Sequence, residues 1–164
     1  YKITMLAEPS FLIEILNDYN NIRIIPEFKL IRYNQRLFTH TSAEQYDLVS
    51  ANLASAYSIK ESAPAEFLSN LCSLVDDRGI LSVKLSNFTR LNNTMLISIN
   101  KLVMKFSNYF IIQHASGLFF YGSNSFYKDF EEYMVRWWLP DEVENPVRII
   151  VKPEIDLLLT NKGF

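Results

Sequence analysis

Glycine is the residue type that most limits what this chain can fold into. The sequence has only 4 glycines in 164 residues, whereas average usage would give roughly 11. They are Gly79, Gly117, Gly122 and Gly163. A loop that cradles a phosphate or a dinucleotide needs several glycines within a few positions, because its backbone must come close to the ligand. The printed sequence contains no such loop.

The composition is that of a globular domain with a substantial core. Hydrophobic residues make up 49% of the chain and aromatic residues 14%. We therefore expect residues 1–164 to form a single domain. The 16 basic and 18 acidic residues give a net charge of −2. This balance lacks the excess of basic residues that is typical of proteins that bind nucleic acid. No apolar run approaches the ~18 residues of a membrane span, so we expect no direct membrane insertion.

Cysteine and histidine are too few for a metal site of the usual kind. The sequence has one cysteine, Cys72, and two histidines, His40 and His114. Because zinc sites are built mainly from these residue types, we expect no metal ligands. A lone cysteine cannot form an internal disulfide, which favours a reducing, cytoplasmic location. We interpret Cys72 as a core residue and His114 as a structural one.

Short apolar runs, rich in β-branched and aromatic residues, predict strands along most of the chain. The predicted strands are residues 3–7, 22–25, 28–31, 46–53, 80–85, 109–115, 118–121, 147–151 and 155–159. The dipeptide Ser116-Gly117 predicts a hairpin between two of them. The run Asp76-Asp77-Arg78-Gly79 predicts a turn.

Helices are predicted between these strands by cap residues and by apolar positions three or four apart. Ser10 is an N-cap candidate, residues 34–41 suggest one or two helical turns, and Asn92-Asn93 marks a further helix start. After Pro64, one apolar stripe is formed by Phe67, Leu68, Leu71, Cys72 and Val75. The last predicted helix, residues 126–138, is strongly aromatic.

The alternation of strands and helices predicts the α/β class: a mainly parallel Rossmann-like sheet with helices on both faces. The late hairpin predicts that the last strand of this sheet is reversed.

Several segments together resemble the spermidine synthase (polyamine aminopropyltransferase) branch of the class I S-adenosylmethionine-dependent methyltransferase fold. The segments are Tyr46-Asp47-Leu48-Val49, Glu66-Phe67-Leu68 with Leu71 and Leu74, Asp77-Arg78-Gly79, Ile80-Leu81-Ser82-Val83, residues 117–123 and Leu159-Thr160-Asn161. The resemblance extends over nearly the whole chain, and the shared residues are chiefly structural.

The resemblance assigns roles to four positions, and three of them hold the wrong residue type for that role. Glu8 matches the acidic residue that binds the cofactor ribose hydroxyls. Tyr33 lies where the family has an acid near the adenine site. Asn52 occupies the position of the general base, and an amide cannot take a proton near neutral pH. Ser55 replaces a second acid that would help to hold a cationic polyamine.

The resemblance also implies that the family's glycine loop is missing from the printed residues. That loop follows the first strand of the fold, and only seven residues precede Glu8. In one interpretation residues 1–7 are the second strand and the first lies upstream. In the other, residues 1–7 are the first strand and Ala7-Glu8-Pro9-Ser10 replaces the loop. Neither leaves an intact cofactor site.

From these substitutions we expect a degenerate spermidine-synthase-like domain that acts as a structural or interaction module of a larger protein. No cofactor is expected to bind the fragment, and the expected partner is a second copy in a homodimer or the rest of the parent chain. The alternative is part of an active aminopropyltransferase or methyltransferase that uses S-adenosylmethionine or its decarboxylated form, with the glycine loop upstream of Tyr1. We read the chain as a piece of a longer protein, cytoplasmic or the soluble domain of a membrane-anchored parent.

Overall fold

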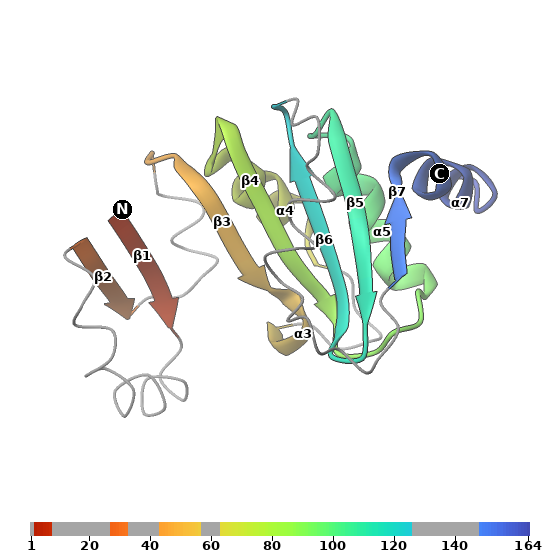
Figure 1. The fold of residues 1–164 in the computed structure, drawn as a ribbon, viewed down its shortest axis with the longest axis horizontal. Helices are drawn as coiled ribbons and strands as arrows, with labels where there is room; N and C mark the ends of the chain where they lie inside the picture. Colours follow the sequence, from red (N-terminus) through yellow and green to blue (C-terminus); the bar gives the residue numbers. More distant parts are fainter. Residues whose placement is uncertain (1, 8–26, 33–42, 57–62, 126–147) are drawn as a thin grey trace. The chain divides into compact units, whose positions relative to one another are not determined.

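The computed structural model describes residues 2–7, 27–32, 43–56, 63–125 and 148–164, which belong to two compact units, Tyr1–Ala43 and Glu44–Phe164. In the first unit, strands β1 (Lys2–Ala7) and β2 (Glu27–Arg32) form a parallel pair (Figure 1). Their register runs from Lys2 opposite Glu27 to Ala7 opposite Arg32. The strands predicted at residues 3–7 and 28–31 are therefore confirmed.

The second unit is built on a five-stranded sheet in the order β3-β4-β6-β5-β7 (Figure 1). Its strands are β3 (Tyr46–Asn52), β4 (Val75–Ser86), β5 (Asn108–His114), β6 (Gly117–Ser123) and β7 (Arg148–Val151). β3 and β4 are parallel, and the other three pairings are antiparallel. The predicted α/β class and its late hairpin, β5 to β6, are confirmed.

Two described helices of this unit follow the predicted starts. α4 (Ala65–Ser73) has Pro64 at its N-cap, where a missing N–H costs nothing. α5 (Asn93–Val103) has Asn92 at its N-cap, and the side-chain oxygen of Asn92 accepts a hydrogen bond of 2.8 Å from the Met95 N–H. This bond satisfies one of the donors that a helix N-terminus leaves unpaired. A further helix, α3 (Leu53–Ala56), follows β3 directly.

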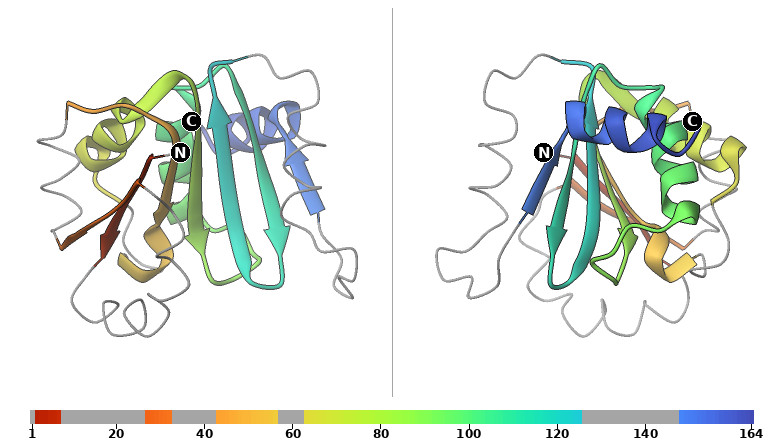
Figure 2. Two further views of the ribbon diagram at one scale, coloured as in Figure 1. Left: turned by 60° about the vertical axis from the view of Figure 1, so that its left-hand side comes forward. Right: turned by 90° about the vertical axis from the view of Figure 1, so that its right-hand side faces the viewer.

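The helices α4, α5 and α7 (Lys152–Thr160) lie against one face of the sheet (Figure 2). Phe106, just after α5, packs with its ring centroid 6.4 Å from that of Phe120. The Tyr109 hydroxyl donates to the Asp156 carboxylate of α7. Register fixes the row of side chains on this face: Ala51, Val83, Phe120, Ile111 and Ile150. This helix-covered face therefore carries the main core, in which Val83 and Phe120 are fully buried.

Residues 155–159 are helical, so the strand predicted there is wrong. They lie within α7, where Pro153 occupies the first turn and Ile155 and Leu159 are buried one helical turn apart. Leu157 and Leu158 remain exposed. Four apolar residues interrupted by Asp156 fit either a strand or a helix by pattern, and contact with the sheet selects the helix.

The turn predicted at residues 76–79 is also wrong, because these residues are part of strand β4. Tyr46 pairs with Val75 and Leu48 pairs with Ile80, so residues 76–79 form a wide bulge opposite Asp47. The Arg78 N–H donates to the Asp76 carboxylate at 3.0 Å, a local bond of the kind that favours turns. Val75, predicted as the last member of the α4 stripe, begins the strand instead.

Other predicted elements lie outside the described residues. They are the helix after Ser10, the strand at residues 22–25, the helical turns at residues 34–41 and the aromatic helix at residues 126–138.

Candidate site at the carboxyl end of the sheet

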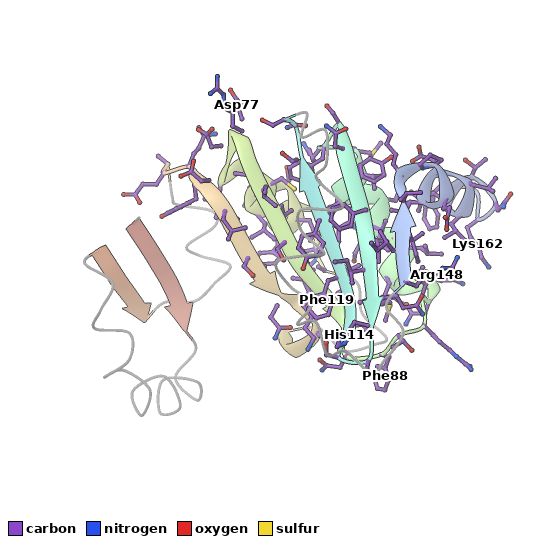
Figure 3. The ribbon with its side chains drawn as sticks, viewed as in Figure 1. Asp77, Phe88, His114, Phe119, Arg148 and Lys162 are labelled. Atoms are coloured by element: carbon purple, nitrogen blue, oxygen red, sulfur yellow. The ribbon has the colours of Figure 1, made fainter. Side chains whose placement is uncertain are left out.

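Parallel strands place their carboxyl ends at one edge of a sheet, and ligands of open α/β sheets bind outside that edge. β3 ends at Asn52 and β4 ends at Ser86, and the β5–β6 hairpin lies at this same end (Figure 1). Figure 3 shows Phe119, His114 and Phe88 there. This carboxyl edge is the candidate site.

Asn52 is the last residue of β3, and its side chain is exposed. Its register partner on β4 is Lys84, so the two side chains lie on the same face of the sheet, one strand apart. A carboxamide can donate and accept hydrogen bonds, but it cannot act as a general base near neutral pH.

Lys84 is a half-buried cation on the sheet face opposite the helix-covered face. Its ammonium lies 5.6 Å from the ring centroid of Phe119, its register partner on β6. No local sequence pattern points to Lys84. Its neighbours Asn52 and Phe119 are far from it in sequence, and only the register brings the three residues together.

The described segments that form this edge contain no carboxylate. Residues 51–56 and 84–91 include no Asp or Glu, whereas Lys84 and Arg90 are basic. A cationic amine or sulfonium group needs carboxylates near it when it leaves water. The described residues of the edge therefore do not fit such a group.

The loop after β4 is tied to the β5–β6 hairpin. Gly117 has φ +133°, and a Cβ there would overlap the Ser86 carbonyl oxygen. The Ser86 hydroxyl accepts a hydrogen bond of 2.9 Å from the Phe88 N–H. The Gln113 side-chain amide donates to the Thr89 carbonyl at 2.6 Å. These contacts fix the backbone beside the edge, and Phe88 is held there with 57% of its surface exposed.

A buried pair of hydroxyls lies on the same face as Lys84, two residues earlier on β4. Ser82 and Tyr121 are register partners, both are buried, and their side chains are hydrogen-bonded to each other. Burial raises the pKa of the Tyr121 hydroxyl, and the hydrogen bond with Ser82 acts in the opposite direction. Both hydroxyls therefore stay uncharged. The neighbouring residues of this face on β5, Phe110 and Ile112, are apolar.

The other residues named from the sequence are not brought together at this edge. Glu8 and Tyr33 lie outside the described residues, and Ser55 lies in α3, within the segment where only the backbone is described. His114 ends β5, where its Nδ1 is 2.8 Å from the Ser116 hydroxyl oxygen and accepts from the Ser116 N–H at 3.2 Å. These two bonds belong to the hairpin turn.

Cys72 lies in α4, partly covered. Burial raises the pKa of its thiol to about 12, and the charge of Lys105 lowers it by a smaller amount. A thiol with such a pKa is a poor nucleophile and a poor metal ligand at neutral pH.

The described part of the chain contains neither a cluster of metal-binding side chains nor a membrane-spanning helix. No group of three or more His, Cys, Asp and Glu side chains in it could hold a metal ion. None of its helices is long and apolar enough to cross a membrane.

Comparison with known proteins shows the fold alone. No family model matches the sequence, and no curated protein matches it. Among solved structures, spermidine synthase from Thermotoga maritima superposes with a TM-score of 0.58 at 13% identity, covering 96% of this chain and 55% of that one. A spermidine synthase in complex with the transition state analogue AdoDATO gives 0.57 and 13%, covering 96% and 57%.

A third solved structure, a putative caffeoyl-CoA O-methyltransferase from Staphylococcus aureus, gives a TM-score of 0.47 at 12% identity over 74% of this chain and 64% of that one. The two spermidine synthase superpositions show that this chain has a fold similar to that of spermidine synthase. It spans little more than half the length of the two spermidine synthases.

Proposed function

We propose that this chain is a degenerate spermidine-synthase-like domain that keeps the scaffold and has lost transfer chemistry, and that it acts as a structural or interaction module. One observation carries the proposal. At the carboxyl edge, the amide-bearing Asn52 is the register partner of Lys84, and the described segments of the edge, residues 51–56 and 84–91, supply no carboxylate.

The chemistry of aminopropyl transfer explains why this matters. A polyamine acceptor is cationic, and its attacking amine must lose a proton. Carboxylates at the edge would attract the cation and accept the proton. Lys84 repels a cationic substrate instead, and Asn52 takes no proton. The resemblance that maps Asn52 to the general base supports the same conclusion.

Ligand titration tests the loss of the cofactor site. We expect S-adenosylmethionine and methylthioadenosine to give no saturable heat with this chain at millimolar ligand in isothermal titration calorimetry. A dissociation constant in the low micromolar range for either ligand would contradict the degenerate site.

A pair of substitutions tests the assigned position of the base. Asn52→Asp restores a carboxylate at the end of β3, and Ser50→Asp places one two residues earlier on the same face as a matched control. Aminopropyl transfer to putrescine should be undetectable in the unmodified protein, and in a longer protein that contains these residues. If that longer protein binds the cofactor, Asn52→Asp should restore transfer and Ser50→Asp should not. If the unmodified protein transfers the aminopropyl group and Asn52→Ala leaves the rate unchanged, Asn52 does not occupy the position of the general base.

The alternative is part of an active aminopropyltransferase or methyltransferase whose glycine loop lies upstream. Its support is the fold likeness to spermidine synthases, of which this chain spans 55–57%. The two proposals separate on one measurement, because only the alternative predicts that a longer protein containing these residues binds S-adenosylmethionine or its decarboxylated form.

The partner proposed for the isolated chain is a second copy of itself. β3 is an outer strand of the five-stranded sheet, and its Leu48 has 60% of its surface exposed. An outer strand with an exposed apolar side chain favours pairing with another chain, and two-fold dimers are the commonest closed assembly. In the parent protein the same surface would contact the rest of the chain.

Sedimentation equilibrium at about 100 μM tests this association. We expect a dimer, and we expect Leu48→Lys to make it a monomer because an edge charge opposes strand pairing. Leu157→Lys is the matched control, since Leu157 is 62% exposed on α7. A strict 19.1 kDa monomer of the unmodified chain would contradict the proposal.

A further inference from the structure

Five polar side chains gather on the sheet face that lies opposite the helix-covered face. Register places Ser50 beside Ser82 and Ser82 beside Tyr121, and it places Asn52 beside Lys84. We call these five residues the donor patch. The patch runs from the buried Ser82–Tyr121 pair, through the half-buried Lys84, to the exposed Ser50 and Asn52. It is therefore reachable from solvent at its β3 side.

All members of the donor patch can donate hydrogen bonds. The lysine ammonium has three donors and no acceptor, the amide has two donors, and each hydroxyl has one. Over Leu48 to Asn52, Ile80 to Lys84 and Phe119 to Ser123, the residues that register assigns to this face include no Asp or Glu. A group of donors without a carboxylate is complementary to an anion.

Lys84 is the charged member of the patch, and no described residue supplies it with a partner of opposite charge. It makes no ion pair with any described residue, and its ammonium lies over the ring of Phe119. A half-buried cation without a counterion loses hydration that nothing replaces. A bound anion would restore that interaction through a charge-assisted hydrogen bond to the Lys84 ammonium.

We infer that the donor patch binds a small anionic ligand through a carboxylate or phosphate group held by Lys84. The inference goes beyond the proposed function, because it concerns what this edge accepts rather than which chemistry it has lost. It rests on Lys84 and not on the mapping of Asn52, so the anion titration and the S-adenosylmethionine titration can fail separately.

Amide chemical shifts of the 15N-labelled full chain provide the test. Sodium acetate and sodium phosphate are titrated in separate experiments, against sodium chloride at equal ionic strength. We expect saturable shifts confined to the ends of β3 and β4 and to the facing part of β6. Acetate or phosphate alone producing them would identify the ligand as a carboxylate or a phosphate, respectively.

Three variants decide whether Lys84 is responsible. Lys84→Met keeps the length of the side chain and should weaken the binding at least tenfold, whereas Lys84→Arg should retain it. Lys101→Met, which removes a cation from the last turn of α5, should leave the binding unchanged. The amide spectrum of each variant also reports whether it is folded. Shifts scattered over surface lysines, or binding that survives Lys84→Met, would overturn the inference.

Discussion

The two faces of the five-stranded sheet differ in chemistry although they are made by the same strands. On the helix-covered face, Val83 and Phe120 are register partners and fully buried. On the opposite face, the next residues along the same strands are Lys84 and Phe119, which are register partners and only half-buried. The first face has to pack against helices, so only apolar residues of matching shape fit it. The second face is apolar and buried toward β5, at Phe110 and Ile112, and carries its polar groups toward β3, where the candidate site lies.

The largest expected effect comes from testing the two faces at adjacent positions of β6. Phe120→Ala should lower the free energy of unfolding by about 3–5 kcal/mol, because it leaves a cavity among the rings of Phe106 and Tyr109. Phe119→Ala removes a half-buried ring and should cost no more than about 1–2 kcal/mol. Urea denaturation measures both. Equal losses would mean that the two faces contribute alike to stability.

The next largest effect concerns the backbone beside the site rather than either face. Gly117→Ala should cost at least about 2 kcal/mol, since it combines a positive φ with overlap on the Ser86 carbonyl. Gly163→Ala is the control, because Gly163 also has a positive φ, +79°, but open space around it. That control should cost only about 1 kcal/mol, because it has the backbone strain without the overlap. Similar costs for the two variants would show that the hairpin does not press against the end of β4.

Much of the scaffold could be predicted because it follows from local chemistry. Asn92 is an N-cap residue type, and it caps α5 through its side chain. The Ser116-Gly117 pair predicts a hairpin, and Gly117 has the positive φ that such a turn uses. In both cases the deciding interaction lies within a few residues of the signal.

The prediction failed where distant residues decide the outcome. α7 is a helix because Ile155 and Leu159 are both buried one turn apart while Asp156 accepts from Tyr109 on β5. Residues 76–79 are turn-forming types, but pairing with β3 on both sides keeps them within β4. The site follows the same rule, since the family resemblance assigns a role to Asn52, whereas Lys84 gains its role only from the register with β3 and β6.

A pH-dependent effect of intermediate size sharpens the description of the helix-covered side. Burial raises the pKa of the Cys72 thiol from 9.0 to about 12. The folded state therefore holds this proton more tightly than the unfolded state does. Its contribution is fully present below pH 9 and is lost as the pH rises toward 12.

We expect this loss to reach about 1 kcal/mol at pH 10. Cys72→Ala should reduce the fall in the free energy of unfolding between pH 8 and pH 10, as measured by urea denaturation at each pH. Tyr109 and Tyr121, whose pKa values are also raised, contribute mainly above pH 10. An unchanged fall in Cys72→Ala would mean that the thiol is not desolvated in the folded chain.

The smallest expected effect is the stability change caused by Lys84→Met, and it completes the contrast between the two faces. A lysine on the packed, helix-covered face would need a counterion. Its replacement there by an apolar residue of similar length would change the free energy of unfolding by a large amount. On the opposite face the ammonium keeps partial contact with water, and methionine can take over the contact of the lysine stem with Phe119. The free energy of unfolding should therefore change by no more than about 0.5 kcal/mol. A loss of about 2 kcal/mol or more in urea denaturation would assign Lys84 a structural role, whereas a near-neutral change together with loss of anion binding separates function from stability at this residue.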